Sequence, residues 1–563
     1  MLLSSSCYMV SSTALAIRKD STILYTRIGL IILFYCIILS YKNLFITYLD
    51  EGIGLFGGLF FTSSITQSFH IFIFVISFLI LNMTGFFVRK LVSEEEYMSF
   101  NELLSIIPLY IKDTVVSNII LKKGEQYNIL EYTVMLLFII IGSVLLISSN
   151  DLISIYLAIE LQSYGLYLLC AIYRNSESST SSGLTYFLLG GLASCFILLG
   201  IALIYANLGV TYLDSFYVIN NLAGIINEEE IITYIPYCLL ILSVGFLFKI
   251  SAAPFHFWSP DVYDGIPTIV TTFVAIIAKI SILILFLQLV HYTYNIYLTT
   301  QYSWITSLLL SSLLSLVIGT ILGLTQTRIK RLYAYSTISH LGFILLALTI
   351  NSLESIQAFI FYLMQYSISN LNAFIILVAI GYSLYAYNDN NINHSNLIDK
   401  NNSPIQLIVQ LEGYFYINSM LALSLAITLF SFAGIPPLVG FFGKQMVFSA
   451  ALQEGFIFIT LIGVLASVVS GVYYLFVIKT MFFDYYYYTY FNNLENISIP
   501  TLILKNGKIE NEKDFDSKIA LSSSLTITIS ILTLFILLFM FIPNEWLYMS
   551  NLLSIVLFIP NSI

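Results

Sequence analysis

The sequence predicts an all-α polytopic membrane protein with about fourteen transmembrane helices. Three observations predict this class: 58% of the 563 residues are hydrophobic, only 9% are charged, and the mean hydropathy is +0.91. A soluble chain of this length needs far more charge to cover its surface. Apolar runs of about 20 residues, long enough to cross about 30 Å of hydrocarbon, recur along the whole chain.

The candidate transmembrane helices follow one another with mostly short connections. They lie at 2–17, 24–42, 67–88, 129–150, 151–173, 183–206, 235–257, 266–290, 303–325, 331–350, 355–386, 412–450, 456–482 and 519–541. Glu131 and Asp151 lie at helix starts, where an acidic side chain favours the positive end of the helix dipole. The final segment after residue 543 is short and carries Trp and Tyr, so we expect an interfacial segment, with a fifteenth crossing as the alternative.

The basic residues support this helix count. Of the 22 Lys and Arg residues, three lie inside predicted helices. If the chain changes sides at every helix, all of the others except Lys42 fall on the side opposite the N-terminus. Because a miscounted helix would scramble this asymmetry, the positive-inside rule supports both the count and an outward-facing N-terminus. Lys330 and Arg331, on the basic side, are expected to anchor the topology.

No soluble domain is predicted between the helices. The longest polar connections, 388–404 and 484–518, are rich in Asn, charge and turn-forming residues. The chain has no CxxCH, no Walker or Rossmann glycine pattern and no haem-spaced histidine pair, so we expect no redox centre or nucleotide site in it. The five cysteines are expected to be small buried hydrophobic residues, at Cys7, Cys36, Cys170, Cys195 and Cys238.

The seventh and twelfth helices are predicted to be broken. The seventh carries Lys249 before Pro254, and the twelfth carries Lys444 after Pro436 and Pro437. Proline removes a backbone donor and interrupts a helix. Matching broken segments in two halves of a chain indicate an ion path at the bilayer midplane, where only protein or water can satisfy the freed backbone. The alternative is that these prolines only kink their helices.

The spacing of the two breaks predicts an internal duplication. Five crossings separate the breaks, so helices four to eight and nine to thirteen are two five-helix repeats, and the odd number makes the second copy inverted. This organisation divides the chain into four parts. They are 1–128 (helices one to three and a loop), 129–290 (first repeat), 303–483 (second repeat) and 484–563 (loop, helix fourteen and interfacial segment).

Four strong acids or bases are placed well inside the apolar slab, at Glu160, Lys249, Lys279 and Lys444. A charged side chain at this depth costs about 2.5–3.5 kcal/mol on insertion scales. Burial favours the neutral form of such a group, and a nearby opposite charge favours the charged form. We therefore predict a proton relay in which Glu160 and Lys249 form the modulating pair, Lys279 is central and Lys444 is on the exit side. The alternative is a static ion pair with two lysines that line a cavity.

Two histidines lie beside these groups. His340 is a candidate member of the relay because histidine titrates near neutral pH, and the alternative is a hydrogen-bonded core residue. His256 follows Pro254 in the broken seventh helix. For His256 we favour a structural role, in which it bonds carbonyl groups that the break leaves free.

Four stretches between about residues 129 and 483 resemble the subunit 2 family of respiratory complex I: SSNDLISIYLAIELQSYGLYLL, FLFKISAAPFHFWSPDVYDGIPT, RLYAYSTISHLGFILL and LFSFAGIPPLVGFFGK. The phrases AIELQS and KISAAPFHFW separate this family from the related subunits 4 and 5. The resemblance implies an antiporter-like, proton-translocating subunit in the membrane arm of NADH:ubiquinone oxidoreductase. Glu160, Lys249, Lys279 and Lys444 match the acid and the three lysines of the family. Subunit 4 is expected to have a glutamate at the last position, so Lys444 favours subunit 2.

The resemblance also implies a setting for the chain. The expected partners are other membrane-arm subunits, including antiporter-like subunit 4 and small membrane subunits, and membrane lipids, with no nucleic acid. FMN, iron-sulfur clusters and ubiquinone are expected in other subunits. Heavy use of Phe, Tyr, Ile and Asn and the lack of an Arg-rich presequence predict an organelle-encoded protein of the mitochondrial inner membrane, with its N-terminus on the intermembrane-space side. The alternatives are a subunit of a multi-subunit cation/proton antiporter and a non-conducting scaffold.

Overall fold

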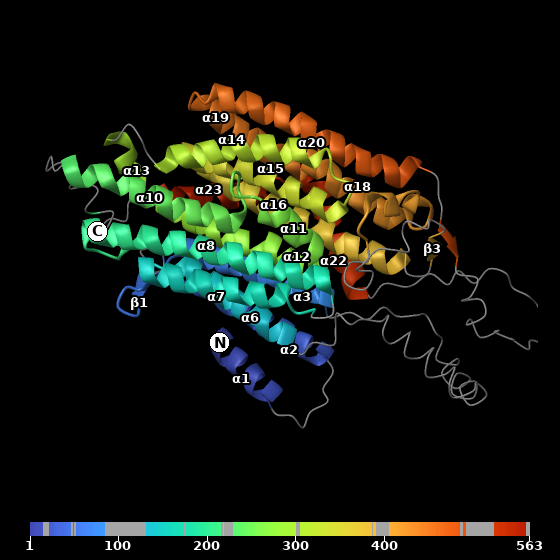
Figure 1. Ribbon diagram of the computed structural model, residues 1–563, viewed down its shortest axis with the longest axis horizontal. Helices are drawn as coiled ribbons and strands as arrows, with labels where there is room; N and C mark the ends of the chain where they lie inside the picture. The colour runs from blue at the N-terminus through green and yellow to red at the C-terminus, as the bar shows by residue number, and fades with distance from the viewer. Residues whose placement is uncertain are drawn as a thin grey trace, which may run out of the picture.

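The computed structural model confirms the all-α membrane class. It describes residues 1–14, 22–46, 49, 52–84, 131–173, 176–215, 218, 229–299, 304–384, 387–389, 405–484, 488–490 and 523–558. Within these ranges, 11 helices are long and apolar enough to cross a membrane, and two shorter apolar helices accompany them. The helices run roughly along one common axis (Figure 1). Most of the predicted loops 388–404 and 484–518 lies outside the described residues.

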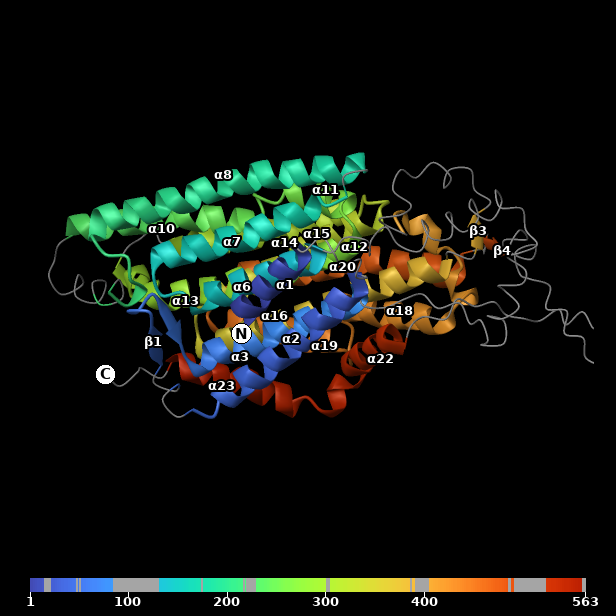
Figure 2. The ribbon, with the colours of Figure 1, turned by 90° about the horizontal axis from the view of Figure 1, so that it is seen from below.

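The N-terminal part lies along one side of the bundle. It contains α1 (Leu2–Ala14), α2 (Thr22–Asn43) and α3 (Ser64–Thr84). The predicted first helix, 2–17, is helical to Ala14, and residues 15–21 lie outside the described part. Helix α2 packs along α3, and α1 packs against α6 (Glu131–Ser148) at the edge of the bundle (Figures 1 and 2).

The first predicted repeat begins with α6 and continues through α7 (Leu152–Cys170), α8 (Glu177–Leu208) and α10 (Glu229–Ile250). Both acidic helix starts are confirmed. Glu131 is the first residue of α6. The Asp151 side chain caps α7 by accepting hydrogen bonds from the backbone N–H groups of Ile153 and Ser154, at 3.2 and 3.3 Å.

The predicted break of the seventh helix is present. Helix α10 ends at Ile250, the short helix α11 (Trp258–Gly265) follows, and Lys249 lies in the last turn before the break. The next crossing is divided as well, into α12 (Thr268–Ala275) and α13 (Ile277–Thr299). We did not predict this interruption, because no proline or glycine lies between residues 268 and 299.

The second predicted repeat also has three straight crossings followed by a broken one, but its fifth crossing is a single continuous helix. Its helices are α14 (Trp304–Gly323), α15 (Ile329–Ile350), α16 (Leu353–Leu384), α18 (Ser419–Ala433), α19 (Val439–Gln453) and α20 (Ile457–Phe483). Both prolines lie in the break between α18 and α19, and Lys444 follows that break. Lys249 precedes its own break, so the two lysines occupy opposite sides of their interruptions, as an inverted pair would.

The predicted span of 412–450 differs from the structure at both ends. The chain before α18 forms two short 3₁₀ helices, Ile408–Leu411 and Tyr414–Tyr416, because Gly413 turns there with φ +64°. The Gly413 N–H donates to the carbonyl of Thr480 on α20. Helix α18 begins only at Ser419, after Asn418, whose side chain caps the helix by accepting from the Leu421 N–H. The crossing is therefore two helices of ordinary length joined at the break.

The C-terminal part is a bent pair of helices, α22 (Ser523–Leu538) and α23 (Asn544–Phe558), joined by the 3₁₀ turn Phe539–Phe541. Both helices pack along α16, and Figure 2 shows them one after the other along the bundle. The Gln357 side chain near the start of α16 donates to the carbonyl of Leu547 on α23, at 3.4 Å. The segment that we expected to lie in the interface thus packs lengthwise on the bundle.

The connections confirm that the chain alternates between the two ends of the bundle. At one end, β1 (Ile53–Leu55) pairs with β2 (Phe60–Thr62), and isolated bridges join Phe60 to Ser149 and Asp151 to Tyr212. At the other end, β3 (Tyr387–Asp389) pairs with β4 (Tyr488–Tyr490), and Arg328 pairs with Leu407. Among the described residues, the connections joined at each end are therefore alternate ones, as an alternating chain requires.

The interior of the bundle is formed by α13, α15 and α16. The apolar windows of α15 and of the joined α12–α13 crossing are each 94% buried, against 33% for α8. Helices α8 and α20 lie on the outside and leave large apolar side chains exposed, including Leu184, Leu188 and Val468.

Cys36, Cys170 and Cys238 are buried as predicted, whereas Cys7 and Cys195 are exposed because they lie on outward helix faces.

Candidate functional site

Glu160 of α7 and Lys249 of α10 form a buried ion pair. The Lys249 Nζ lies 3.5 Å from the Glu160 Oε1, and the two side chains are 5% and 12% exposed. The same ammonium donates to the Tyr167 hydroxyl at 3.1 Å. Tyr167 lies two turns after Glu160 on α7, so one helix supplies both partners of the lysine. The pair that the sequence predicted is therefore in contact.

Aromatic residues close the break beside Lys249. The Trp258 Nε1–H, at the start of α11, donates to the carbonyl of Phe248 at 2.8 Å. The Trp258 ring stacks on Tyr186, which in turn meets Tyr167 edge to face. The His256 Nδ1 has no hydrogen-bond partner among the described residues, but the ring has a backbone hydrogen bond to Pro254 within the break. Trp258 shares the predicted structural role by binding the Phe248 carbonyl.

Lys279 lies at the centre of the bundle and is 1% exposed. It lies in the first turn of α13, just after the interruption at Ile276. The Lys279 Nζ donates to the Thr337 hydroxyl on α15 at 3.1 Å, and it lies 5.6 Å from the ring centroid of Tyr263 on α11. A cation at this distance from an aromatic ring is attracted to it. Lys279 therefore bridges the two predicted repeats.

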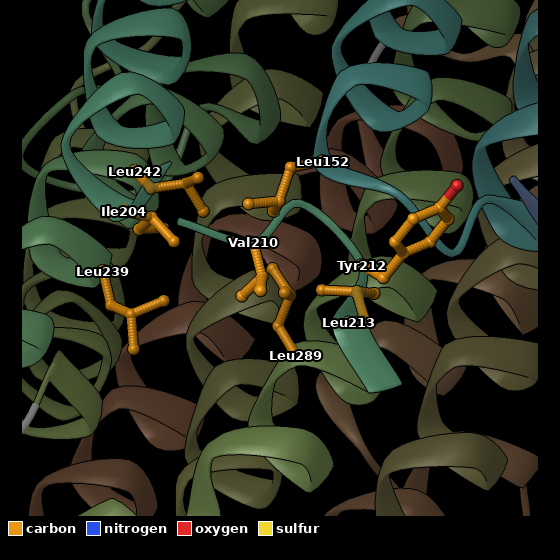
Figure 3. A pocket seen from close by; sticks show the side chains of 8 residues that line it. All are labelled: Leu152, Ile204, Val210, Tyr212, Leu213, Leu239, Leu242 and Leu289. Atoms are coloured by element: carbon orange, nitrogen blue, oxygen red, sulfur yellow. The ribbon is translucent and has the colours of Figure 1, made fainter. Parts of the chain in front are cut away.

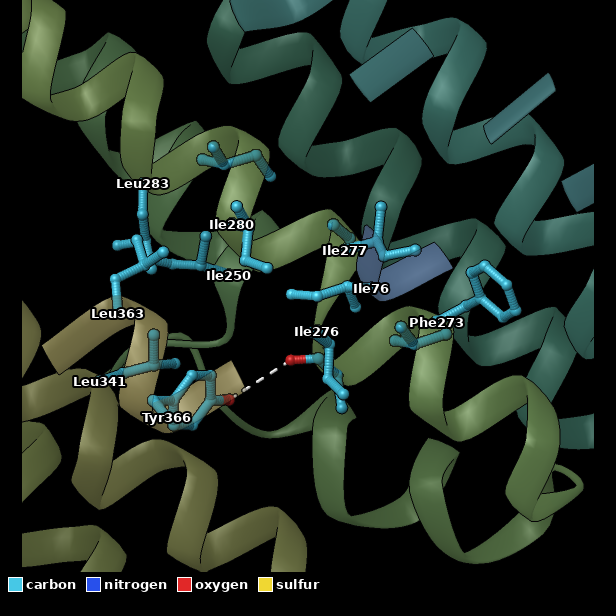
Figure 4. Packing of buried hydrophobic residues seen from close by; sticks show 14 of the residues in the cluster. Ile76, Ile250, Phe273, Ile276, Ile277, Ile280, Leu283, Leu341, Leu363 and Tyr366 are labelled. Carbon is cyan, nitrogen blue, oxygen red and sulfur yellow. Dashed lines mark hydrogen bonds between the residues drawn. The ribbon is translucent and has the colours of Figure 1, made fainter. Parts of the chain in front are cut away.

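The interruption beside Lys279 is itself stabilised from α16. The Tyr366 hydroxyl donates to the carbonyl of Ala275, the last residue of α12, at 3.3 Å. Figure 4 shows this bond as a dashed line within tightly packed apolar side chains, among them Ile276, Ile277 and Leu341. A carbonyl freed by a helix break is costly in such surroundings unless it finds a donor. Tyr366 supplies the donor.

A second pair ties α7 to α13 at the level of the charged groups. The Gln162 amide lies 3.1 Å from the Ser281 hydroxyl, through both its nitrogen and its oxygen. Gln162 follows Glu160 by two residues, and Ser281 follows Lys279 by two. Sequence reasoning missed this contact, although a glutamine inside an apolar run was a visible signal. No hydrogen bond or ion pair among the described residues joins Lys249 directly to Lys279.

His340 lies on α15, one turn beyond Thr337. Its Nδ1 lies 2.7 Å from the Tyr362 hydroxyl of α16, and its Nε2 lies 3.3 Å from the Tyr474 hydroxyl of α20. One ring nitrogen of a neutral histidine donates and the other accepts, so the two tyrosines play different roles. The ring is fully enclosed, at 2% exposure. This arrangement suits both a proton carrier and a satisfied core histidine.

Lys444 binds the end of the helix before its own break. Its Nζ donates to the carbonyls of Phe432 and Ala433, the last residues of α18, at 3.0 and 2.9 Å. A cation at a helix C-terminus is favoured by the helix dipole. Gly434 turns there with φ +84°, and a Cβ on it would meet the Lys444 side chain at 2.9 Å. The Lys444 Nζ also lies 5.4 Å from the ring centroid of Phe343 on α15.

Helix α15 therefore passes along the second half of the series. Thr337 contacts Lys279, His340 follows one turn later, and Phe343 contacts Lys444 one further turn on. Three residues correspond to about 4.5 Å along a helix axis. Lys279 of α13, His340 and Lys444 of α19 thus follow one another along the length of α15. Glu160 and Lys249 form a separate pair.

The pocket shown in Figure 3 lies away from these groups. Aliphatic side chains and Tyr212 line it, with no charged residue among them. The described residues contain no group of three or more His, Cys, Asp or Glu side chains that could hold a metal ion.

Comparison with known proteins shows what the chain is similar to. A sequence model of the family described as "NADH:quinone oxidoreductase/Mrp antiporter, TM" matches residues 149–470. The chain is 43% identical over 551 residues to NADH-ubiquinone oxidoreductase chain 2 of Rhizopus oryzae, covering 98% of both chains. It is 36% identical over 371 residues to NADH-quinone oxidoreductase subunit N of Rhodospirillum rubrum, covering 66% of this chain and 71% of that one.

Two solved structures share the fold. A chain of respiratory complex I from Thermus thermophilus aligns with a TM-score of 0.67 at 22% identity, over 97% of this chain and 99% of that one. A chain of the Mrp complex from Dietzia sp. aligns with a TM-score of 0.71 at 16% identity, over 99% and 96%. At these identities, the likeness concerns the fold alone.

Proposed function

The chain belongs to the NADH:quinone oxidoreductase/Mrp antiporter family, as an antiporter-like subunit of complex I of the chain 2 type, and we propose that its buried Glu/Lys series carries protons across the membrane. Glu160 and Lys249 form the modulating pair, Lys279 is the central carrier and Lys444 lies on the exit side. His340 lies between Lys279 and Lys444 and passes the proton between them.

The observation that carries this proposal is the placement of three lysines inside the apolar bundle. As whole residues, Lys249, Lys279 and Lys444 are 8%, 1% and 6% exposed, and only Lys249 has a carboxylate partner among the described residues. An unpaired buried ammonium is costly, and one response is to give up its proton. A lysine that binds its proton under one local field and releases it under another is a proton carrier.

The Glu160–Lys249 pair supplies the local field that changes. Its separation of 3.5 Å is longer than the roughly 2.7–2.9 Å of a tight charge-assisted hydrogen bond. When Glu160 is close and charged, it favours the protonated form of Lys249, and when it moves or gains a proton this support is lost. Lys249 therefore holds its proton in the first state and passes it toward Lys279 in the second.

Hydroxyl groups lie along the part of the series from Lys279 to Lys444. Thr337, Tyr362 and Tyr474 each contact a member of the series, and a hydroxyl can donate and accept at once. Each charge moved against the membrane potential needs about 2.3 kcal/mol per 100 mV. That energy comes from electron transfer elsewhere in the complex.

We propose the following setting on the same basis. The chain lies in the mitochondrial inner membrane with its basic end toward the matrix and its N-terminus toward the intermembrane space. Its neighbours are the other membrane-arm subunits, including antiporter-like subunit 4 and small membrane subunits, and lipids. FMN, the iron-sulfur clusters and the ubiquinone site belong to other subunits. The mitochondrial relative at 43% identity supports the location.

A replacement of Lys249 by Met tests the proposal. Met keeps the length and apolar stem of the side chain but carries no proton. The complex is isolated from membranes, its assembly is checked by native electrophoresis, and NADH-driven proton uptake is measured in vesicles. We expect an assembled complex whose proton uptake is lost. Normal uptake would instead assign the lysine a purely structural role, as in a scaffold.

A further inference from the structure

Three cationic residues at the start of α15 hold the short helix α11. Arg328 forms an ion pair with Asp264 of α11, and Arg331 contacts both Asp261 and Asp264, the latter with Nε 3.4 Å from Oδ2. The Lys330 Nζ, buried at 1% exposure, donates to the carbonyl of Ile266 at 2.7 Å. We name Asp264, Arg328, Lys330 and Arg331 the α11–α15 clamp.

The basic residues of the clamp lie at the N-terminus of α15, where positive charge is unfavourable. Positive side chains at a helix N-terminus are repelled by the positive end of the helix dipole. Three basic residues within four positions at the start of α15 are therefore unfavourable without negative partners. The buried carboxylate of Asp264 and the carbonyl of Ile266, the residue that caps the end of α11, offset this. Topology anchoring, the role that we expected for Lys330 and Arg331, does not require these contacts.

The two clamped helices are the ones that hold Lys279. Tyr263, whose ring faces the Lys279 ammonium, lies directly before Asp264 on α11. Thr337, which accepts the hydrogen bond of Lys279, lies two turns after Lys330 on α15. The separation of α11 and α15 therefore sets the separation of the ring and the hydroxyl between which the ammonium lies.

From this geometry we infer that the α11–α15 clamp positions Lys279 for proton transfer, with Asp264 as its central residue. Asp264 is paired with two arginines, and its side chain is only 10% exposed. Asp261 is 67% exposed, and Arg331 is its one ion-pair partner in the part of the chain that the structure describes. Exposed pairs contribute little, so Asp261 offers a matched control on the same helix. The inference rests on the proposed role of Lys279 as a proton carrier.

The test compares Asp264→Asn with Asp261→Asn in the intact complex. Assembly is measured by native electrophoresis, and NADH-driven proton uptake is measured per assembled complex in vesicles. We expect Asp264→Asn to lower this rate about threefold or more and Asp261→Asn to leave it within about a fifth of the parent. The conservative Asp264→Glu variant keeps the charge and is expected to recover most of the rate. A purely structural aspartate would lower the amount of complex but leave the rate per complex unchanged, which would overturn the inference.

A double variant separates positioning from any other effect of Asp264. If the clamp acts through the Thr337 contact, Asp264→Asn combined with Thr337→Ala is no slower than Thr337→Ala alone, because coupled residues are not additive. Multiplied losses would overturn the inference. Lys279→Met separates the proton-carrying role of Lys279 from the positioning role of the clamp. If it pumps normally, the proposed function fails, whereas if it is inactive while Asp264→Asn is normal, only the clamp inference fails.

Discussion

The charged ends of Lys249 and Glu160 lie 3.5 Å apart although 89 residues separate them in the chain. The carboxylate comes from the unbroken helix α7 and the ammonium from the last turn of α10, at a break. One partner therefore lies on a continuous helix and the other lies beside an interruption of the helical backbone. A change in the separation of the two charges would therefore have to come from the α10 side of the pair.

Removing the carboxylate tests this asymmetry. In Glu160→Gln, Lys249 loses its charged partner and keeps only neutral acceptors, which are the Tyr167 hydroxyl and the new amide oxygen. Loss of one member of a buried ion pair costs about 3–5 kcal/mol, and Lys249 then lacks the carboxylate that favours its charged form. NADH-driven proton uptake per assembled complex should fall at least about tenfold. Glu354→Gln, on the exposed first turn of α16, is the control, and equal rates in both variants would contradict the prediction.

The Tyr167 hydroxyl should matter less than the carboxylate. Tyr167→Phe removes one hydrogen bond to a charged group, worth about 1.5–3 kcal/mol, but keeps the ring contacts with Tyr186 and Phe187. We expect a smaller loss of proton uptake than in Glu160→Gln and normal assembly. Tyr164→Phe is a matched control, because Tyr164 lies on the same helix but is 54% exposed. A loss as great as that of Glu160→Gln would show that the hydroxyl, not the carboxylate, governs Lys249.

Trp258 is expected to stabilise the first break. Trp258→Phe removes the donor to the Phe248 carbonyl, and a buried acceptor left without a partner costs about 1–3 kcal/mol. The isolated complex should therefore lose its native state at a lower temperature, measured by the loss of NADH oxidation after heating. Trp304→Phe is the comparison, because its partner Thr293 keeps a bond to the Leu289 carbonyl. A larger effect at Trp304 would be inconsistent with this account.

The second break has no room for a side chain at Gly440. A Cβ there would lie 1.8 Å from the Ser431 carbonyl oxygen on α18, which is backbone and cannot move aside cheaply. We expect Gly440→Ala to prevent assembly of the complex. Gly471→Ala, in open space on α20, should assemble normally, since alanine is favoured over glycine in a helix by about 1 kcal/mol. Native electrophoresis of both variants checks the pair, and an assembled Gly440→Ala complex would refute the predicted clash.

The helix breaks and the alternation of the chain between the two ends could be predicted from the sequence, because prolines and basic residues indicate them. Pro254 and the Pro436–Pro437 pair marked both breaks, and the basic residues marked the alternation of ends. The interruption at Ile276 had no such mark, and the carbonyl that it frees is bound from a distant helix, by Tyr366 of α16. A contact across 91 residues leaves no local pattern in the sequence.

The same distinction holds for the candidate site. Lone ionisable residues in apolar runs are conspicuous, so Glu160, Lys249, Lys279 and Lys444 could be identified from the sequence. Their partners could not, because threonine and tyrosine are common in membrane helices and nothing local marks Thr337 or Tyr167. Lys330 and Arg331 could be assigned to a membrane face but not to the aspartates of α11, which lie about 70 residues earlier in the chain.

The central claim is that Lys279 carries the proton through the middle of the bundle, and Lys279→Met tests it most directly. The measurement is NADH-driven proton uptake per assembled complex in sealed vesicles, with Lys479→Met, at an exposed position on α20, as the control. The account predicts that Lys279→Met assembles but loses proton uptake by about tenfold or more, whereas Lys479→Met behaves as the parent. An assembled Lys279→Met complex with full proton uptake would contradict it.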